Sequence, residues 1–279
     1  MATWLITGAS SGLGAALARA VLARGDNAVV TARNTDHVQE LVDAHPDRAL
    51  AVALEIGQHD QVVAAVAAAT ERFGSIDVLV NNAGHGYRAA VEEASVEEVD
   101  ELFATNFFGP VDLIKQVPPQ MRRRRSGTIV NVSSIGAPRS NPASGYYTAT
   151  KAALEGMSDA LNREVGPLGI RVLVIEPGAF RTDFAGRSLA QSSTVIDDYA
   201  DTAGKRRKEN DTSHGTQPGD PDRAAQVIID TVSGETAPFR LLLGSDAIRI
   251  VREELQSRID EIDAWARVST TTDYGEEDA

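Results

Sequence analysis

The chain has 279 residues and a formal net charge of −13 at pH 7. This acidity argues against nucleic acids and anionic membrane surfaces as partners, because both demand basic patches. The sequence holds no cysteine, which excludes disulfides and thiolate metal sites. Its length fits one large domain or two small ones, and we favour one α/β domain.

A glycine-rich turn follows the first apolar run of the chain. Residues 3–6 are expected to form a strand and residues 15–24 a helix that ends at Gly25, and the turn from Thr7 to Gly14 reads Thr-Gly-Ala-Ser-Ser-Gly-Leu-Gly. Backbone N–H groups and the positive end of the helix dipole favour an anion there, and glycines let a pyrophosphate approach closely. The turn therefore predicts a phosphate site, and a simple tight turn is the alternative.

Further β-rich runs alternate with helical stretches, at residues 27–31, 49–54, 77–80, 128–132 and 171–175. Near-continuous apolar strands are buried on both faces, so helices must lie above and below them. We expect an α/β fold, a doubly wound parallel sheet with helices on both faces, in a single Rossmann-type domain over residues 1–268. Ligands bind at the carboxyl ends of such strands, where Gly8, Asn81, Ser134 and Pro177 follow the first, fourth, fifth and sixth strands.

The end of the second strand bears on the choice of cofactor. An acid there binds the adenine ribose of NAD, whereas an arginine accepts the 2′-phosphate of NADP. The strand ends at Ala32 and Arg33, and the planar guanidinium of Arg33 suits a phosphate. We therefore favour NADP(H). In the alternative, Arg33 is solvated and Asp36 binds the ribose of NAD, although residues 34–36 look more like a helix cap.

Tyr147 and Lys151 lie four residues apart, so a helix would place them on one face, a turn apart. A phenol titrates near pH ~10. An ammonium about 5 Å away, at an effective dielectric of about 20, favours the phenolate by roughly 3 kcal/mol. The pair therefore predicts a tyrosine with a lowered pKa, suited to acid–base chemistry near neutrality. The alternative is an ordinary helix pair with an exposed lysine.

Six short motifs occur in an order and spacing that resembles the short-chain dehydrogenase/reductase family. They are the glycine turn, Asn81-Asn82-Ala83-Gly84, Asn106, Ser134, the segment Tyr147-Thr-Ala-Thr-Lys151, and Pro177-Gly178. The resemblance runs from about Thr3 to about Thr182. It implies that Tyr147 donates a proton to the substrate carbonyl oxygen, that Lys151 binds the nicotinamide ribose, that Ser134 binds the same carbonyl oxygen, and that Asn106 holds a water beside the lysine.

Two of these four catalytic roles have alternatives. Ser133 neighbours Ser134, and only the family spacing selects Ser134. Asn106 could instead stabilise a helix kink, and the two roles can coexist.

The resemblance also implies a set of cofactor contacts. They are Gly8, Ser10, Ser11, Gly12, Leu13, Gly14, Arg33, Glu55, Asn82, Ala83, Gly84, Tyr147, Lys151, Pro177, Gly178 and Thr182. Thr182 would bind the carboxamide of the nicotinamide, whereas Asn81 would bind the neighbouring strands instead. Glu55 departs from the aspartate that the family usually has there, which puts its adenine contact in doubt.

Residues beside the motifs suggest the substrate pocket: His85, Tyr87, Ala137 and Phe180, together with Pro138 and Ser144. Most are neutral or aromatic, so we expect a fairly apolar ketone, aldehyde or secondary alcohol. Residues 184–219 show little periodicity and correspond to the family's variable substrate loop, with plain surface disorder as the alternative. An NAD(H)-dependent alcohol dehydrogenase and a non-catalytic dinucleotide sensor remain the rival functions.

The C-terminal part predicts helices at residues 221–232 and 245–267 and a frayed acidic tail at 269–279. Pro118 and Pro119 should bend or end a helix, and Arg122–Arg125 are interpreted as a solvated helix end. The C-terminus lacks the compact ending of tetrameric family members, so we favour a homodimer or a monomer. No apolar stretch reaches about 18 residues, and neither a signal peptide nor an H-x-x-x-H pair is present, so we expect a soluble, cytoplasmic protein without a catalytic metal.

Overall fold

The fold comes from a computed structural model, which describes residues 1–186, 188–208 and 215–274. A seven-stranded sheet of order β3-β2-β1-β4-β6-β7-β9 forms its centre, and every neighbouring pair is parallel. The strands are β1 (Thr3–Ile6), β2 (Asn27–Ala32), β3 (Ala49–Ala53), β4 (Val78–Asn81), β6 (Gly127–Val132), β7 (Ile170–Pro177) and β9 (Arg240–Leu243). The doubly wound α/β fold is therefore confirmed, with its reversal of strand order between β1 and β4.

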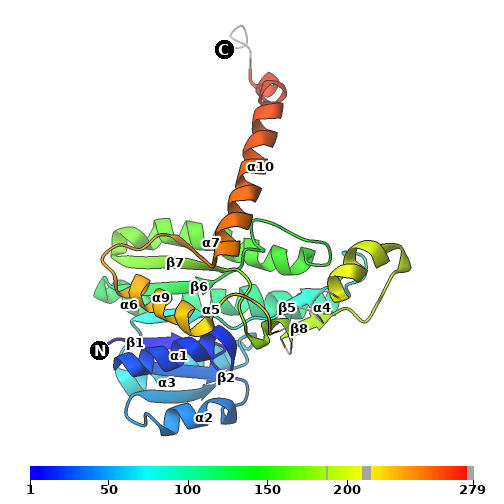
Figure 1. The fold of residues 1–279 in the computed structure, drawn as a ribbon. Coiled ribbons are helices and arrows are strands. Elements are labelled where there is room, and N and C mark those ends of the chain that lie inside the picture. Colours follow the sequence, from blue (N-terminus) through cyan, green and yellow to red (C-terminus); the bar gives the residue numbers. More distant parts are fainter. Residues whose placement is uncertain (187, 209–214, 275–279) are drawn as a thin grey trace.

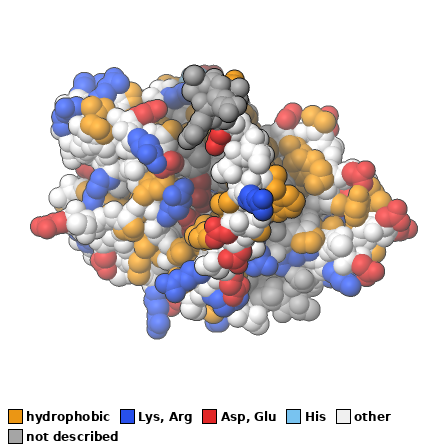
Figure 2. Space-filling model, turned by 90° about the horizontal axis from the view of Figure 1, so that it is seen from above, with side chains coloured by type: hydrophobic (Ala, Val, Ile, Leu, Met, Phe, Trp, Pro, Cys, Tyr) orange, Lys and Arg blue, Asp and Glu red, His pale blue; other side chains and the backbone are white. Residues whose placement is uncertain are grey.

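One helix stands away from the body. This is α10 (Ser245–Ser269), followed by a turn at Thr270–Thr272, and it projects alone from the end of the sheet that carries β7 and β9 (Figure 1). The view from above in Figure 2 shows acidic, basic and hydrophobic side chains interspersed on this face. Because residues 269–272 are helical, the prediction of a frayed tail from Ser269 is wrong for them, and residues 275–279 lie outside the described part. No helix among the described residues is both long and apolar enough for a membrane span.

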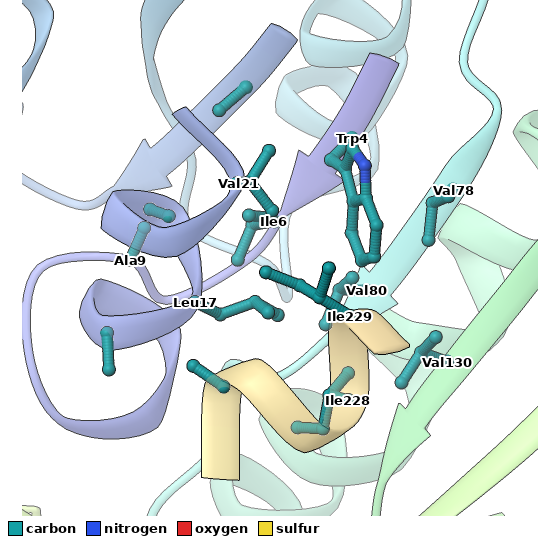
Figure 3. Packing of buried hydrophobic residues seen from close by; sticks show 14 of the residues in the cluster. Trp4, Ile6, Ala9, Leu17, Val21, Val78, Val80, Val130, Ile228 and Ile229 are labelled. Atoms are coloured by element: carbon teal, nitrogen blue, oxygen red, sulfur yellow. The ribbon is translucent and has the colours of Figure 1, made fainter. Parts of the chain in front are cut away.

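The first face of the sheet is covered by α1 (Gly12–Arg24), α2 (Asp36–Asp43) and α9 (Pro221–Ser233). Figure 3 shows Leu17 of α1 and Ile229 of α9 meeting Trp4 and Val80 of the sheet. These side chains are almost wholly buried, and each such burial stabilises the fold by about 1.5–3 kcal/mol. This packing fixes α1, and with it the glycine turn, against the end of β1.

The second face is covered by α3 (His59–Phe73), α5 (Gly109–Gln116), α6 (Pro118–Arg124) and α7 (Gly145–Val165). The chain enters α5 from α4 (Val96–Phe103) through a π-helical turn, Ala104–Phe108. The predicted break at the two prolines is confirmed, because α5 ends before them and α6 begins at Pro118, where a missing N–H costs little. The last turn of α6 carries Arg122, Arg123 and Arg124, as expected of a solvated helix end.

Three strands escaped prediction. β9 extends the main sheet, while β5 (Gly86–Arg88) and β8 (Leu189–Gln191) form a small parallel sheet of their own. The described parts of residues 184–219 also contain helical turns at Asp183–Ala185, Asp197–Tyr199 and Ala200–Gly204, so this segment is more ordered than its sequence indicates. Residues 187 and 209–214 of the predicted loop lie outside the described residues. Pairing partners about a hundred residues apart leave no local signal.

Candidate active site

A cavity of about 980 Å³ opens at the carboxyl ends of the strands. It collects the glycine turn, the end of β2, residues 82–84, the loop after β6, the start of α7 and the end of β7. Of the expected cofactor contacts, all but Gly14 line it: Gly8, Ser10, Ser11, Gly12, Leu13, Arg33, Glu55, Asn82, Ala83, Gly84, Tyr147, Lys151, Pro177, Gly178 and Thr182. Asn81 and Pro177 are the last residues of β4 and β7, one position earlier than expected.

The glycine turn has the geometry of an anion cradle. Gly8 and Gly12 have φ of 66° and 56°, a left-handed conformation that other residues rarely adopt. Ser11 precedes α1 without a side-chain cap, and the first turn of the helix contains no acid, so the positive helix end faces the cavity. These features fit a dinucleotide diphosphate.

Gly14 has a packing role rather than a place in the cavity wall. A Cβ on Gly14 would lie 2.4 Å from Asn82 Nδ2 and 2.5 Å from the Gly8 carbonyl oxygen. Asn82 in turn donates hydrogen bonds from Nδ2 to the carbonyl oxygens of Thr7 and Gly8, at 2.9 and 3.2 Å. Gly14 therefore lets α1 approach the turn closely, which corrects its prediction as a cofactor contact.

The end of β2 presents Arg33 to the cavity. The Arg33 side chain is exposed and lines the wall, whereas Asp36 lies in α2 and does not. The carboxamide oxygen of Asn34 accepts a hydrogen bond from the Asp36 N–H at 3.0 Å, so the interpretation of residues 34–36 as a helix cap fits the structure. The cationic group of this region is thus the one that faces the ligand space.

Tyr147, Ser134 and Lys151 converge beside the end of β6. The Ser134 hydroxyl lies near enough to the Tyr147 phenol to lower its pKa, and Ser134 Oγ accepts the Gly136 N–H at 3.0 Å. Lys151 Nζ donates to the Val132 carbonyl oxygen at 2.9 Å and lies 5.9 Å from the centre of the Tyr147 ring. Both side chains are buried, so the phenol is held in a fixed position on the cavity wall.

The predicted lowering of the Tyr147 pKa is wrong for the protein described here. Burial raises the pKa of Tyr147, and the Ser134 hydroxyl and the charge of Arg88 oppose this only in part. Burial likewise lowers the pKa of Lys151 to about 8, against the attraction of Glu155. The sequence argument placed the pair in a solvated setting and omitted desolvation, which disfavours the charged form of both groups.

A network of charged groups behind Lys151 distinguishes the two neighbouring serines. The Ser133 hydroxyl donates to Glu155 Oε1 at 2.6 Å and is committed to this contact, whereas Ser134 faces Tyr147. Arg240 Nε lies 3.2 Å from Glu155 Oε2 and 3.6 Å from Glu176 Oε1. Burial and the neighbouring Glu155 raise the pKa of Glu176 to about 7, and Arg240 opposes this.

Asn106 lies behind the cavity wall rather than in it. It is wholly buried in the π-helical turn, where its Oδ1 accepts the His85 N–H at 3.0 Å and its Nδ2 donates to the His85 carbonyl oxygen at 2.9 Å. A Cβ on Gly84 would lie 3.0 Å from Asn106 Oδ1 and 3.5 Å from Lys151 Nζ. Asn106 thus ties the irregular helix to the loop beside the lysine, as the kink alternative expected.

The predicted substrate residues divide into two groups. His85 and Phe180 line the cavity, whereas Tyr87 and Ala137 do not. The Tyr87 ring is buried elsewhere, and its hydroxyl donates to Glu98 Oε2 at 2.7 Å. Pro138 and Ser144 also lie outside the lining.

The rest of the substrate end comes from the segment 184–219 that the sequence analysis assigned to the substrate loop, although it named no single pocket residue there. Phe184, Ser188, Ala190, Arg206, Thr216 and Gln217 all line the cavity. An ion pair between Arg207 and the buried Glu93 fastens the helical turn at 205–208 to the body. Arg206 adds a cation to a pocket that we expected to be apolar and neutral. Among the described residues, no group of three or more histidines and carboxylates could hold a metal ion.

Comparisons with known proteins agree with this geometry. The sequence profile of the short chain dehydrogenase family matches residues 2–193. Oxidoreductase BOA17 of Botryotinia fuckeliana is 37% identical over 269 residues, 95% of this chain and 97% of its own length. A 3-ketodihydrosphingosine reductase of Bacteroides thetaiotaomicron is 36% identical over 86% of this chain and 87% of its own.

Solved structures share the fold. A short-chain dehydrogenase from Streptomyces avermitilis superposes with a TM-score of 0.91 at 43% identity, over 98% of both chains. An alcohol dehydrogenase from Thermococcus sibiricus, complexed with 5-hydroxy-NADP, gives 0.71 at 27% identity over 87% of this chain and 96% of its own. A 3-ketoacyl-(acyl-carrier-protein) reductase from Brucella melitensis, complexed with NADH, superposes with a TM-score of 0.74 at 28% identity, over 89% of this chain and 98% of its own. The last two of these neighbours thus bind nicotinamide dinucleotides, and this chain belongs to the short-chain dehydrogenase family of oxidoreductases, which act on CH–OH and C=O groups.

Proposed function

We propose that the protein is an NADP(H)-dependent oxidoreductase that interconverts a fairly apolar ketone or aldehyde with its alcohol. The observation that carries this proposal is the position of Ser134 and Tyr147 beside Lys151, in the wall of the same cavity as the glycine turn. A proton donor, a second hydroxyl and a cation thus lie next to the place where a nicotinamide would lie. A nicotinamide dinucleotide bound there would supply or accept the hydride.

In reduction, Tyr147 gives its phenolic proton to the carbonyl oxygen. Ser134 donates a hydrogen bond to the same oxygen, which stabilises the negative charge that develops on it. Lys151 would bind the nicotinamide ribose and, when protonated, stabilises the phenolate that Tyr147 becomes. The Asn106 side chain fixes the loop at His85, and by the family resemblance Asn106 would also hold the water through which the proton is replaced. Oxidation of an alcohol uses the same groups in reverse.

The cofactor preference rests on Arg33. Its guanidinium faces the cavity at the end of β2, where it can donate two parallel hydrogen bonds to a 2′-phosphate, and Ala32 brings no carboxylate to repel that phosphate. The complex of the alcohol dehydrogenase neighbour with 5-hydroxy-NADP supports the choice, although the reductase neighbour holds NADH. We therefore expect Arg33→Ala to raise the KM for NADPH by about 10- to 100-fold, since one charge-assisted pair contributes about 1.5–3 kcal/mol.

The substrate class rests on Phe180 and Phe184, aromatic side chains in the cavity wall, the second of which lies 5.9 Å from the Tyr147 ring, centre to centre. The name of the 3-ketodihydrosphingosine reductase specifies a keto group as its target, which supports a ketone here.

The test is consumption of NADPH and of NADH, in parallel, with a panel of hydrophobic ketones and aldehydes. Tyr147→Phe should lower kcat by at least about 10²-fold while cofactor affinity stays nearly unchanged, because only the transferable proton is lost. Turnover restricted to NADH would overturn the Arg33 assignment. Dinucleotide binding without turnover of any carbonyl compound in the panel would favour a sensor.

A further inference from the structure

The outer part of α10 has little support from the body. The base of the helix is anchored through the buried side chains of Ala247 and Val251, and beyond it the Arg258 guanidinium donates a hydrogen bond to the Pro138 carbonyl oxygen. Every residue from Leu255 to Tyr274 is exposed, and Figure 1 shows this part of the helix projecting alone. Residues 255–272 would extend about 27 Å at 1.5 Å per residue. A lone helix of this length is only marginally stable in water, so its persistence calls for a partner surface.

The exposed helix carries an apolar stripe. Ile248, Leu255, Ile259, Ile262 and Ala266 follow one another at intervals of seven, four, three and four residues, which places them on one face of a helix. Their larger side chains are well exposed, with 50% of Leu255, 49% of Ile259 and 66% of Ile262 open to solvent. Trp265, 60% exposed, borders the stripe. A stripe of this spacing is typical of helices that pair with other helices.

Charges at one edge of the stripe indicate what covers it. Arg252 and Asp263 lie 11 residues apart, about 16 Å along the axis and about 20° apart around it. Neither forms an ion pair within the described part of the chain, whereas Arg249 and Arg258 are paired within the helix with Glu253 and Glu254. One edge therefore offers a cation near the base and an anion near the tip, both open to an external partner.

We propose that α10 pairs with α10 of a second copy of this chain in an antiparallel arrangement, so that each Arg252 meets the partner's Asp263. The two-fold axis then passes between residues 257 and 258. In that register Leu255 falls between the partner's Ile259 and the partner's Ile262, and Ile248 falls beside the partner's Ala266. One register thus covers the stripe and satisfies both charges twice. This inference concerns assembly and does not depend on the proposed reaction.

Other occupants fit less well. A parallel pair would leave Arg252 and Asp263 about 16 Å apart along the axis and would bring both bodies to the same end of the helices. Residues 245–269 carry six acidic side chains (Asp246, Glu253, Glu254, Asp260, Glu261, Asp263) and four arginines (249, 252, 258, 267), a net charge of −2, which disfavours an anionic lipid surface.

The first experiment measures the mass of the full chain by sedimentation velocity over a range of concentrations. We expect a dimer that Ile262→Glu dissociates, with at least a 100-fold weaker association constant, because the substitution places a carboxylate in the stripe. Ala264→Glu, on the opposite face of the same helix, is the matched control and should leave the dimer intact. A monomer at every concentration, or a dimer that Ile262→Glu leaves unchanged, overturns the proposal.

The antiparallel register has its own test, because the natural chain contains no cysteine. A variant with both Arg252→Cys and Asp263→Cys should form a covalent dimer on mild oxidation, while each single variant should not, since identical positions lie about 16 Å apart in the antiparallel pair. Cross-linking of either single variant would overturn the antiparallel arrangement. Binding to vesicles of anionic lipid by a protein that remains monomeric would assign the stripe to a membrane surface and also overturn the proposal.

Discussion

The two ends of the cavity are built in different ways. The dinucleotide end consists of turns that directly follow strands, and the backbone fixes its geometry, as the left-handed Gly8 and Gly12 show. The substrate end is assembled from segments far apart in sequence, such as Gly86 paired with Leu189 and Arg207 paired with Glu93, which are 114 residues apart. A sequence reports the first kind of construction locally and the second hardly at all.

The pattern of success in prediction follows this difference. Buried apolar runs predicted six strands of the main sheet, and the order of motifs placed the Ser134–Tyr147–Lys151 group correctly in space. Tyr87 was misplaced because adjacency in sequence says nothing about the direction of a side chain in a strand, where neighbours alternate between faces. The strand β9 has a run of three leucines, as long as the apolar run of β4, so this strand was a local signal that the prediction did not use.

The burial of side chains is also not given by the sequence. The spacing of Tyr147 and Lys151 was correct, but the sign of the Tyr147 pKa change was not, because desolvation depends on everything packed around the pair. One local signal was available and unused: Glu155 lies four residues after Lys151, and the same helical argument would have placed a carboxylate below the lysine.

The strongest test of the dinucleotide end is Gly14→Ala. The added Cβ would lie 2.4 Å from Asn82 Nδ2 and 2.5 Å from the Gly8 carbonyl oxygen, far inside van der Waals contact. The Gly8 carbonyl belongs to the backbone of the turn, so it cannot move aside without distorting the turn. We expect a loss of stability of about 3 kcal/mol or more and loss of dinucleotide binding. Urea unfolding and titration with NADPH measure the two effects. Normal stability and normal NADPH affinity would show that the glycine turn can shift to admit a side chain, and that the backbone does not fix this end of the cavity.

The corresponding test of the substrate end is Arg207→Met. Glu93 is buried, and its carboxylate also accepts hydrogen bonds from the backbone N–H groups of Ala90 and Ile196. Because these two hydrogen bonds remain, we expect the loss of the Arg207 ion pair to cost only about 2–3 kcal/mol. The substrate KM should rise several-fold while the KM for NADPH stays constant. Lys205→Ala is the control, because its ion pair with Asp201 is exposed and contributes little. Equal changes in both KM values would mean that the two ends are not separable.

Glu176 tests how much a buried carboxyl at the end of the sheet contributes to the pH dependence of stability. Its pKa is raised from 4.5 to about 7, so the folded protein binds this proton more tightly than the unfolded chain. The stability from this group is full below about pH 4.5 and is lost as the pH rises through about 7. Glu176→Gln removes this titration. Between pH 5 and pH 8 the variant should therefore lose about 2 kcal/mol less of its free energy of unfolding than the natural protein, and its Tm should fall by roughly 5 °C less. Thermal unfolding at both pH values, with the exposed Glu71→Gln as control, measures this; an identical pH dependence in Glu176→Gln and the natural protein would contradict it.

The smallest expected effect belongs to Gly156→Ala, the counterpart of Gly14→Ala. Gly156 lies on the exposed side of α7 with a φ in the ordinary helical range, and a Cβ there would meet nothing within 4 Å. Alanine is favoured over glycine inside a helix by about 0.8–1 kcal/mol, so this substitution should raise the free energy of unfolding and leave kcat and both KM values unchanged. A lower free energy of unfolding, or a lower oligomeric mass in solution, would instead mean that a second copy of the chain packs on α7 at Gly156. The interface between copies would then lie on α7 and not on α10.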